Sequence, residues 1–210
     1  MSLEQLINLF VVLFVVIDPI GTAPIFGALT RGGSASYRRH MAVKGILLAS
    51  GIMLFFAFTG DYLLATLGIS VPAFRIAGGL LLFLVAIDMV FARQSGLRSA
   101  TVREQEEARF KEDISVFPLA FPLLAGPGAL TTILLLAGDA GGDSVKFWAM
   151  LGVLGFVLLL ALVSLLLSGP LMKLLGETGA NVIDRMLGVI LSALAVQFVV
   201  DGVQTVIRQT

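Results

Sequence analysis

The sequence predicts an all-α polytopic membrane protein with six transmembrane helices, arranged as 3+3 inverted repeats with broken first and fourth helices. Hydrophobic residues make up 58% of the 210 residues and charged residues only 13%. Soluble domains carry about 45–50% and about 25%, respectively. Several apolar segments also reach the roughly 20 residues that a helix needs to cross a bilayer. Both observations indicate a chain that is mostly embedded in lipid.

The six expected helices follow one another along the chain with one long polar connection. They are residues 6–30, interrupted at 18–24, then 41–66, 71–91, 114–138, 147–172 and 183–206. The charged connection divides the chain into a first three-helix repeat, 1–91, a cytoplasmic loop, 92–113, and a second three-helix repeat, 114–210. We expect this loop to be solvated, because runs of charge usually are.

The distribution of basic residues predicts the orientation of the chain. Eleven of the 14 Lys and Arg residues fall on one face of this six-helix arrangement, and only Arg75, Lys146 and Arg208 fall on the other. Loops rich in Lys and Arg stay on the cytoplasmic side of a membrane. Both termini are therefore expected outside, which is the periplasm in a cell that has one.

The two halves show weak internal similarity. Pro19 in the first helix corresponds to Pro127 in the fourth at a spacing of 108 residues, and the RIAG segment from Arg75 corresponds to the RMLG segment from Arg185 at a spacing of 110. Because three helices are an odd number, a repeat must be inverted across the membrane. Paired helices interrupted by Gly and Pro are the sequence feature that indicates the substrate site of secondary transporters. The alternative is a pair of proline kinks that only shapes the packing.

The candidate substrate and ion site comprises the residues around the two interruptions. They are Asp18, Pro19, Gly21, Thr22, Pro24, Gly126, Pro127, Gly128, Thr131 and Thr132. A broken helix exposes N–H groups that suit a carboxylate, and carbonyl groups that suit an ammonium group or a cation. This combination favours a small zwitterion such as an amino acid, although a small anion or cation also fits parts of it.

Asp18 is the most informative residue of this set. A charged side chain at the centre of a bilayer costs about 2.5–3.5 kcal/mol on insertion scales and is a functional hypothesis by default. It is expected to hold the substrate ammonium group, to bind Na⁺ or to take up a coupling proton. The structural alternative is that Asp18 caps the half-helix that starts at Pro19. The second half has Gly126 at the corresponding position, so only one repeat carries the acid.

A few other polar residues near the membrane are candidates for gating or for lining a cavity. They are Arg75, Asp88, Arg185 and Gln197. Arg75 and Asp88 lie at opposite ends of the third helix, where snorkelling or local pairing is the simpler expectation. Gln197 lies deep in the sixth helix, where it lines a cavity or bonds a neighbour.

The composition also excludes some functions. The chain has no cysteine, and its single histidine, His40, lies in a basic loop, so no acid–base pair or metal cluster is expected within the membrane. We expect no enzymatic activity and no cofactor other than a coupling ion, H⁺ or Na⁺. A net charge of zero gives no case for a nucleic-acid partner, and the absence of a GxxxxGKS motif argues against ATP as the energy source.

Four ordered motifs resemble the MarC family of integral membrane proteins. They are DPIGTAPIF, FRIAGGLLLFLVAIDMVF, FPLAFPLLAGPGALTT and VIDRMLGVILSALAVQFVVDGV. The resemblance covers essentially the whole chain. It implies a six-helix protein of a bacterial or archaeal inner membrane, a distant relation to the lysine-exporter superfamily, and the carriage of small neutral amino acids such as glycine and alanine.

The expected function is therefore secondary transport of small neutral amino acids resembling glycine, alanine, serine and threonine, driven by an ion or proton gradient through alternating access. Its expected partners are the substrate and the lipid bilayer, and the oligomeric state is left open. The alternatives are a channel, an exporter of another small metabolite, a membrane-embedded enzyme or a membrane protein with no transport role.

Overall fold

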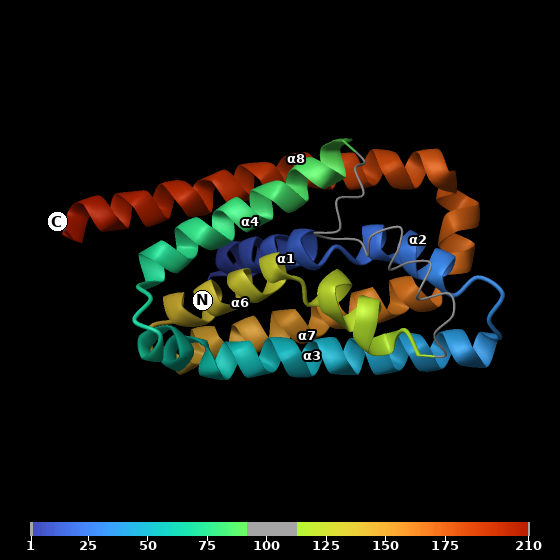
Figure 1. Cartoon of the computed structure of the whole chain (residues 1–210), viewed down its shortest axis with the longest axis horizontal. Helices are drawn as coiled ribbons and strands as arrows, with labels where there is room; N and C mark the ends of the chain where they lie inside the picture. Colours follow the sequence, from blue (N-terminus) through green and yellow to red (C-terminus); the bar gives the residue numbers. More distant parts are fainter. Residues whose placement is uncertain (1, 92–112, 210) are drawn as a thin grey trace.

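The computed structural model describes residues 2–91 and 113–209. Within these residues the chain forms helices and no strand (Figure 1). The helices are α1 (Leu3–Ile17), α2 (Pro19–Leu29), α3 (Ala35–Thr66), α4 (Val71–Phe91), η1 (Ser115–Leu124), α6 (Pro127–Asp139), α7 (Ser144–Leu166) and α8 (Ser168–Gln209). The expected polar loop lies outside the described residues except for Asp113.

The prediction of an all-helical chain with membrane-spanning segments is confirmed. Five helical stretches are long and apolar enough to cross a membrane, counting α1 and α2 as one stretch. The pair η1 and α6, bent by 58°, makes a sixth if it is counted as one span. The third predicted helix, 71–91, has the bounds that the structure shows for α4.

The expected interruption of the first helix is wrong in its extent. It was expected over residues 18–24, but the structure confines it to Asp18. Pro19 opens α2, where its missing N–H costs nothing because the first N–H groups of a helix have no partner within the helix. Pro24 lies inside α2, so the helix continues past it and loses one backbone hydrogen bond.

Two other predicted helix boundaries differ from those in the structure. The second helix was expected from residue 41, but α3 begins at Ala35, where the Ser34 hydroxyl accepts a hydrogen bond from the Tyr37 N–H at 3.1 Å. The fifth helix was expected to run to residue 172, but α7 ends at Leu166. α8 then begins at once and changes direction at Gly176, where φ is 63°.

The buried side chains form two clusters. The larger one joins α1, α2, α3, α6 and α7 with η1, and the smaller one joins α4 and α8 with Val15 of α1. Glycines bring α4 and α8 close together: a Cβ atom on Gly79 would lie 2.7 Å from the Ala195 carbonyl oxygen, and one on Gly188 would lie 2.7 Å from the Met89 Cβ. Small residues permit such close helix contacts, and Figure 1 shows the two helices side by side.

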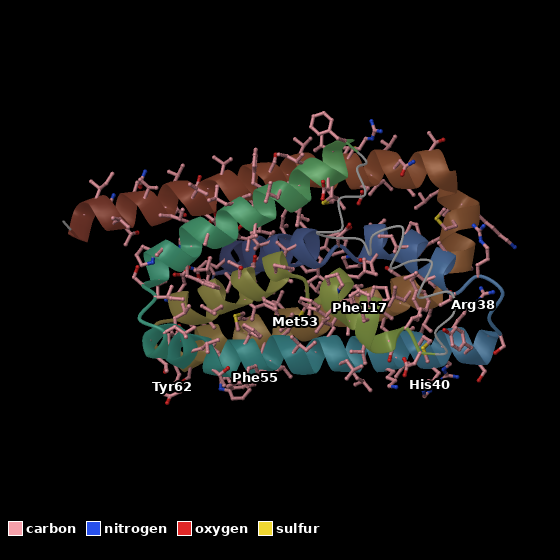
Figure 2. The ribbon with its side chains drawn as sticks, viewed as in Figure 1. Arg38, His40, Met53, Phe55, Tyr62 and Phe117 are labelled. Atoms are coloured by element: carbon pink, nitrogen blue, oxygen red, sulfur yellow. The ribbon has the colours of Figure 1, made fainter. Side chains whose placement is uncertain are left out.

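The chain has two distinct ends. Arg38 and His40 lie at the end where α3 begins, and Tyr62 lies near the other end of α3 (Figure 2). Both chain termini lie toward the Tyr62 end (Figure 1). This arrangement fits an even number of spans.

Candidate functional site

The first junction is the break between α1 and α2, and it consists of Asp18 alone. Asp18 has left-handed backbone angles, φ 47° and ψ 70°. Its N–H donates to the Phe14 carbonyl at 2.9 Å, and its Oδ1 accepts from the Gly21 N–H at 3.0 Å. Asp18 therefore ends α1 and caps α2, as the structural alternative predicted, which is compatible with ligand binding by the rest of its carboxylate.

The polar residues Asp18 and Thr22 are buried at the first junction. Asp18 is 1% exposed and Thr22 2%. The Thr22 hydroxyl donates to the Asp18 carbonyl oxygen at 2.9 Å. Residues of α2 therefore bond both the carbonyl group and the carboxylate of Asp18. Pro19 is buried, whereas Gly21 and Pro24 are half-buried. The first-half members of the predicted site therefore lie together on the first turns of α2.

Asp184 of α8 joins this junction, and sequence reasoning missed it as a site residue. A Cβ atom on Gly21 would lie 2.1 Å from Asp18 Oδ2 and 2.5 Å from Asp184 Oδ1. Because both distances start from one point, these two oxygens lie less than about 5 Å apart. Like charges at this separation repel strongly in a medium of low polarity. A proton, a sodium ion or an ammonium group between them would relieve that repulsion.

Asp184 was not predicted as a site residue because the sixth helix was expected to start at residue 183. An acidic residue in the first turn of a helix is common and does not by itself indicate a site. In the structure the apolar stretch of α8 runs from Thr178 to Arg208, so Asp184 lies more than a turn inside the helix. The signal that would have found it is a carboxylate within a segment long enough to span the membrane.

The second junction is the break between η1 and α6. η1 is irregular, with extended backbone angles at Phe117 and Phe121. Gly126 precedes α6 and provides no side-chain cap, and Pro127 is the first residue of α6. A Cβ atom on Gly126 would lie 2.5 Å from the Pro122 carbonyl oxygen, so the turn requires glycine here. The first backbone N–H groups of α6 therefore donate no hydrogen bond to a side chain at the cap position.

The other second-half members of the predicted site differ in their surroundings. A Cβ atom on Gly128 would lie 2.6 Å from the Leu82 side chain, and the Thr131 methyl group occupies the space beside Gly78, so both contact α4. Thr132 is fully buried, and its hydroxyl has no hydrogen-bond partner among the described residues. Among the predicted site residues of the second half, Thr132 is therefore the one whose hydroxyl is available to bond a ligand.

The two broken units pack side by side in opposite directions. α1 contacts α6, and α2 contacts η1, so the segment before each junction packs against the segment after the other. An antiparallel arrangement of this kind allows two junctions to supply opposite sides of one site.

The four candidate gate or cavity residues differ in their surroundings. Arg75 pairs with Asp139 at the end of α6, and Asp88 is buried near the other end of α4. Arg185 is exposed. Gln197 is exposed as well, and its Nε2 donates to Asp201 Oδ1 at 2.7 Å, so it bonds a neighbour on its own helix.

A pocket of 210 Å³ lies at the end of the bundle near the termini. It is lined by Gln5, Leu9, Leu136, Asp139, Ala140 and Lys146. None of the residues predicted for the substrate site lines it. Its polar groups are one acid, one base and one amide.

Apolar helices long enough to cross a bilayer, with a carboxylate buried at a helix junction, define a polytopic α-helical membrane protein. Residues 3–207 match the family described as MarC family integral membrane protein. The chain belongs to this family, as its motifs predicted.

Relatives from archaea and bacteria match nearly the whole chain. A UPF0056 membrane protein of Archaeoglobus fulgidus is 39% identical over 92% of this chain and 89% of its own. A UPF0056 membrane protein of Methanocaldococcus jannaschii is 36% identical over 97% and 98%. The UPF0056 inner membrane protein YhgN of Escherichia coli is 35% identical over 96% and 98%. No solved structure matches the chain.

Proposed function

We propose that the protein is a secondary transporter of small neutral amino acids, coupled to H⁺ or Na⁺, and not an enzyme. The substrate binds between the two junctions. The observation that carries the proposal is Asp18, a carboxylate that is 1% exposed at a break between two apolar helices. Such a residue is costly to retain unless it binds an ion or a substrate.

The proposed architecture is a 3+3 inverted repeat. α1 to α4 form the first half, and η1 to α8 form the second. Pro19 and Pro127, which the sequence places in corresponding positions, are each the first residue of a helix that follows a break. Two matched breaks in antiparallel units support the kind of midplane site that inverted-repeat transporters use.

The chemistry of the two junctions fits the two ends of an amino acid. Asp18 and Asp184 attract the ammonium group, and the coupling ion or proton binds to the same pair. The start of α6 at Gly126 carries roughly half a positive charge from the aligned peptide dipoles, which suits the carboxylate. The Thr132 hydroxyl adds one hydrogen bond. Small side chains fit a site of this kind, since the residues around it are closely packed.

The proposed location is the inner or plasma membrane of the cell, with both termini outside. The name of the Escherichia coli relative, an inner membrane protein, supports this location. The basic residues Arg38 and Arg39 support the orientation, since they belong to the first turns of α3, and α3 begins at the opposite end of the bundle from the termini.

The test is uptake of radiolabelled alanine and glycine into proteoliposomes of the purified protein under an imposed pH or Na⁺ gradient. We expect saturable uptake that follows one of the two gradients. Asp18→Asn should abolish gradient-driven accumulation while leaving exchange of the substrate across the membrane. Flux that never saturates would indicate a channel. No uptake of either amino acid under any gradient, in both orientations, would overturn the amino-acid assignment.

A further inference from the structure

Among the described residues, two ion pairs join the first half of the chain to the ends of the η1–α6 segment, one at each end of the bundle. Lys44 of α3 pairs with Asp113, which lies two residues before η1. Arg75 of α4 pairs with Asp139, the last residue of α6. In both pairs the base belongs to the first half, and the acid lies at an end of the η1–α6 segment. We call Lys44–Asp113 the inner pair and Arg75–Asp139 the outer pair.

The two pairs lie at opposite ends. Lys44 is in the first turns of α3, close to the end where Figure 2 shows Arg38 and His40. Arg75 follows the turn at the far end of α3 and lies on the second turn of α4. If the basic end is cytoplasmic, the inner pair faces the cytoplasm and the outer pair faces the outside.

The two acids mark the two ends of one bent unit, which is η1 together with α6. Asp113 precedes η1, Asp139 ends α6, and the two helices are bent by 58° at the second junction. The ends of this unit are thus held by α3 at one side and by α4 at the other. Any tilt of the unit that opens one end of the bundle must separate the charged partners at that end.

Between the two pairs lies the buried part of the proposed site. Thr22 is 2% exposed and Thr132 0%. The paired side chains themselves are open to water, with exposed fractions of 42% and 41% for the inner pair and 19% and 57% for the outer pair. The pocket lined by Asp139, Lys146 and Gln5 reaches the outer pair, and none of its lining residues belongs to the proposed site. In the structure both ion pairs are formed at once.

We propose that the outer and inner pairs are the two gates of the transporter, and that they open one at a time. This inference rests on the proposed function, because it names the contacts that alternate when access alternates. Ion pairs as exposed as these are weak, so each can shift the balance between open and closed ends by about fivefold at most. A gate must be this weak, since it has to open in every transport cycle.

The chain contains no cysteine, so single-cysteine reporters need no prior removal of native thiols. Thr132→Cys in α6 and Thr22→Cys in α2 measure how readily a thiol reagent reaches the proposed site. Ser36→Cys and Ser144→Cys are exposed at the inner and outer ends and report sidedness. Ala161→Cys, fully buried in α7, reports general loosening. The probe is a membrane-impermeant thiol reagent applied to right-side-out and inside-out vesicles.

We expect each gate variant to raise the modification rate from one side only. Asp139→Asn should speed labelling of Thr132→Cys or Thr22→Cys from the outside by about two- to fivefold, and Asp113→Asn should do so from the inside. The charge exchange Arg75→Asp with Asp139→Arg should restore the slow rate. Ala161→Cys should stay unlabelled in every background.

Several outcomes would overturn the gates. They are equal acceleration from both sides, labelling of Ala161→Cys in the gate variants, no acceleration at either reporter, or no rescue by the charge exchange. The readout does not require transport of any particular amino acid. If thiol modification is accelerated from one side only but neither alanine nor glycine is taken up, the gate proposal stands and the amino-acid assignment is wrong. If gradient-driven uptake occurs but modification is not accelerated from one side, the amino-acid assignment stands and the gate proposal is wrong.

Discussion

Asp18 and Asp184 meet where Gly21 has no side chain. Asp18 comes from the junction of α1 and α2 and Asp184 from α8, and a Cβ atom on Gly21 would lie 2.1 Å and 2.5 Å from their nearest oxygens. The glycine thus allows a carboxylate from each half of the chain to approach the same turn of α2. The pair makes the first junction a meeting point of the two halves and not only a bend in the first span.

Gly21→Ala should therefore damage the site directly. The added methyl group must displace both carboxylates, because neither distance is compatible with a real Cβ contact. We expect a loss of about 1–3 kcal/mol in the free energy of unfolding from overpacking. Accumulation of alanine in proteoliposomes should fall at least about tenfold, since a displacement that costs about 1.4 kcal/mol in binding already does that.

Gly27→Ala is the matched control on the same helix. Its Cβ atom would lie 3.8 Å from the nearest atom, Ser168 Cβ, which is ordinary van der Waals contact. Alanine favours a helix over glycine by up to about 1 kcal/mol, so this variant should be as stable as the parent or more so. Thermal unfolding in detergent and uptake measure both. Equal behaviour of the two variants would show that the carboxylates do not depend on the space at Gly21.

The two roles of Asp18 can be separated by substitution. Asparagine tolerates left-handed backbone angles and caps helices well, whereas alanine does neither. Asp18 has a φ of 47° and accepts a hydrogen bond from the Gly21 N–H. The free energy of unfolding should therefore be about 2 kcal/mol lower for Asp18→Ala than for Asp18→Asn. Both should lose gradient-driven accumulation, because both lack the charge. Equal stability of the two variants would mean that capping contributes nothing measurable here.

Local rules predicted much of this fold. The apolar lengths gave the bounds of α4, and the preference of Pro for the first helical position marks the starts of α2 and α6 at Pro19 and Pro127. The same preference explains why the first interruption is one residue long. Each of these features depends on residues that are adjacent in the sequence.

The features that the sequence did not predict depend on distant contacts. Asp184 reaches the first junction only because α8 packs on α2, and Asp139 pairs with Arg75 only because α6 lies beside α4. The start of α3 was missed for another reason: the polar residues after Ser34 resemble a loop, but they form a capped first turn that continues into an apolar helix. Charge pairing between helices cannot be deduced from spacing along a chain when the packing order is unknown.

The inner pair should give the protein a pH-dependent stability below neutral pH. The hydrogen bonds from the Lys44 ammonium and then from Ser115 hold the pKa of the Asp113 carboxyl well below its ordinary value of about 4. A carboxyl whose pKa is lowered in the folded state stabilises that state above about pH 4 and loses this contribution as the pH falls through the lowered pKa.

Asp113→Asn should therefore melt at a lower temperature than the parent at about pH 7, and the difference should shrink below about pH 4. The difference should be small, because the Asp113 side chain is 41% exposed and solvent screens the pair. Lys44→Met should show the same difference at neutral pH, since it removes the same ion pair. Melting curves in detergent at a series of pH values test this, and a difference that grows toward low pH would contradict it.

Thr132 offers a test in which stability and transport change in opposite directions. Its hydroxyl is fully buried in α6 and has no hydrogen-bond partner among the described residues, and leaving a buried polar group unsatisfied costs about 1–3 kcal/mol. Thr132→Val keeps the shape and removes that group, so the free energy of unfolding should stay equal or rise. If the hydroxyl bonds the substrate, the variant should raise the KM for alanine by about two- to tenfold, which corresponds to one ordinary hydrogen bond.

The matched control is Thr30→Val, at a threonine that is as buried but already bonded. The Thr30 hydroxyl donates to the Phe26 carbonyl oxygen at 2.8 Å, and its side chain is 1% exposed. Removing it should lower the free energy of unfolding by about 1 kcal/mol and leave the KM unchanged. A Thr132→Val protein that loses stability as Thr30→Val does would show that the Thr132 hydroxyl has a structural partner. Because a residue kept for packing alone would be improved by valine, a gain in stability together with a rise in KM is the result that assigns Thr132 to the substrate site.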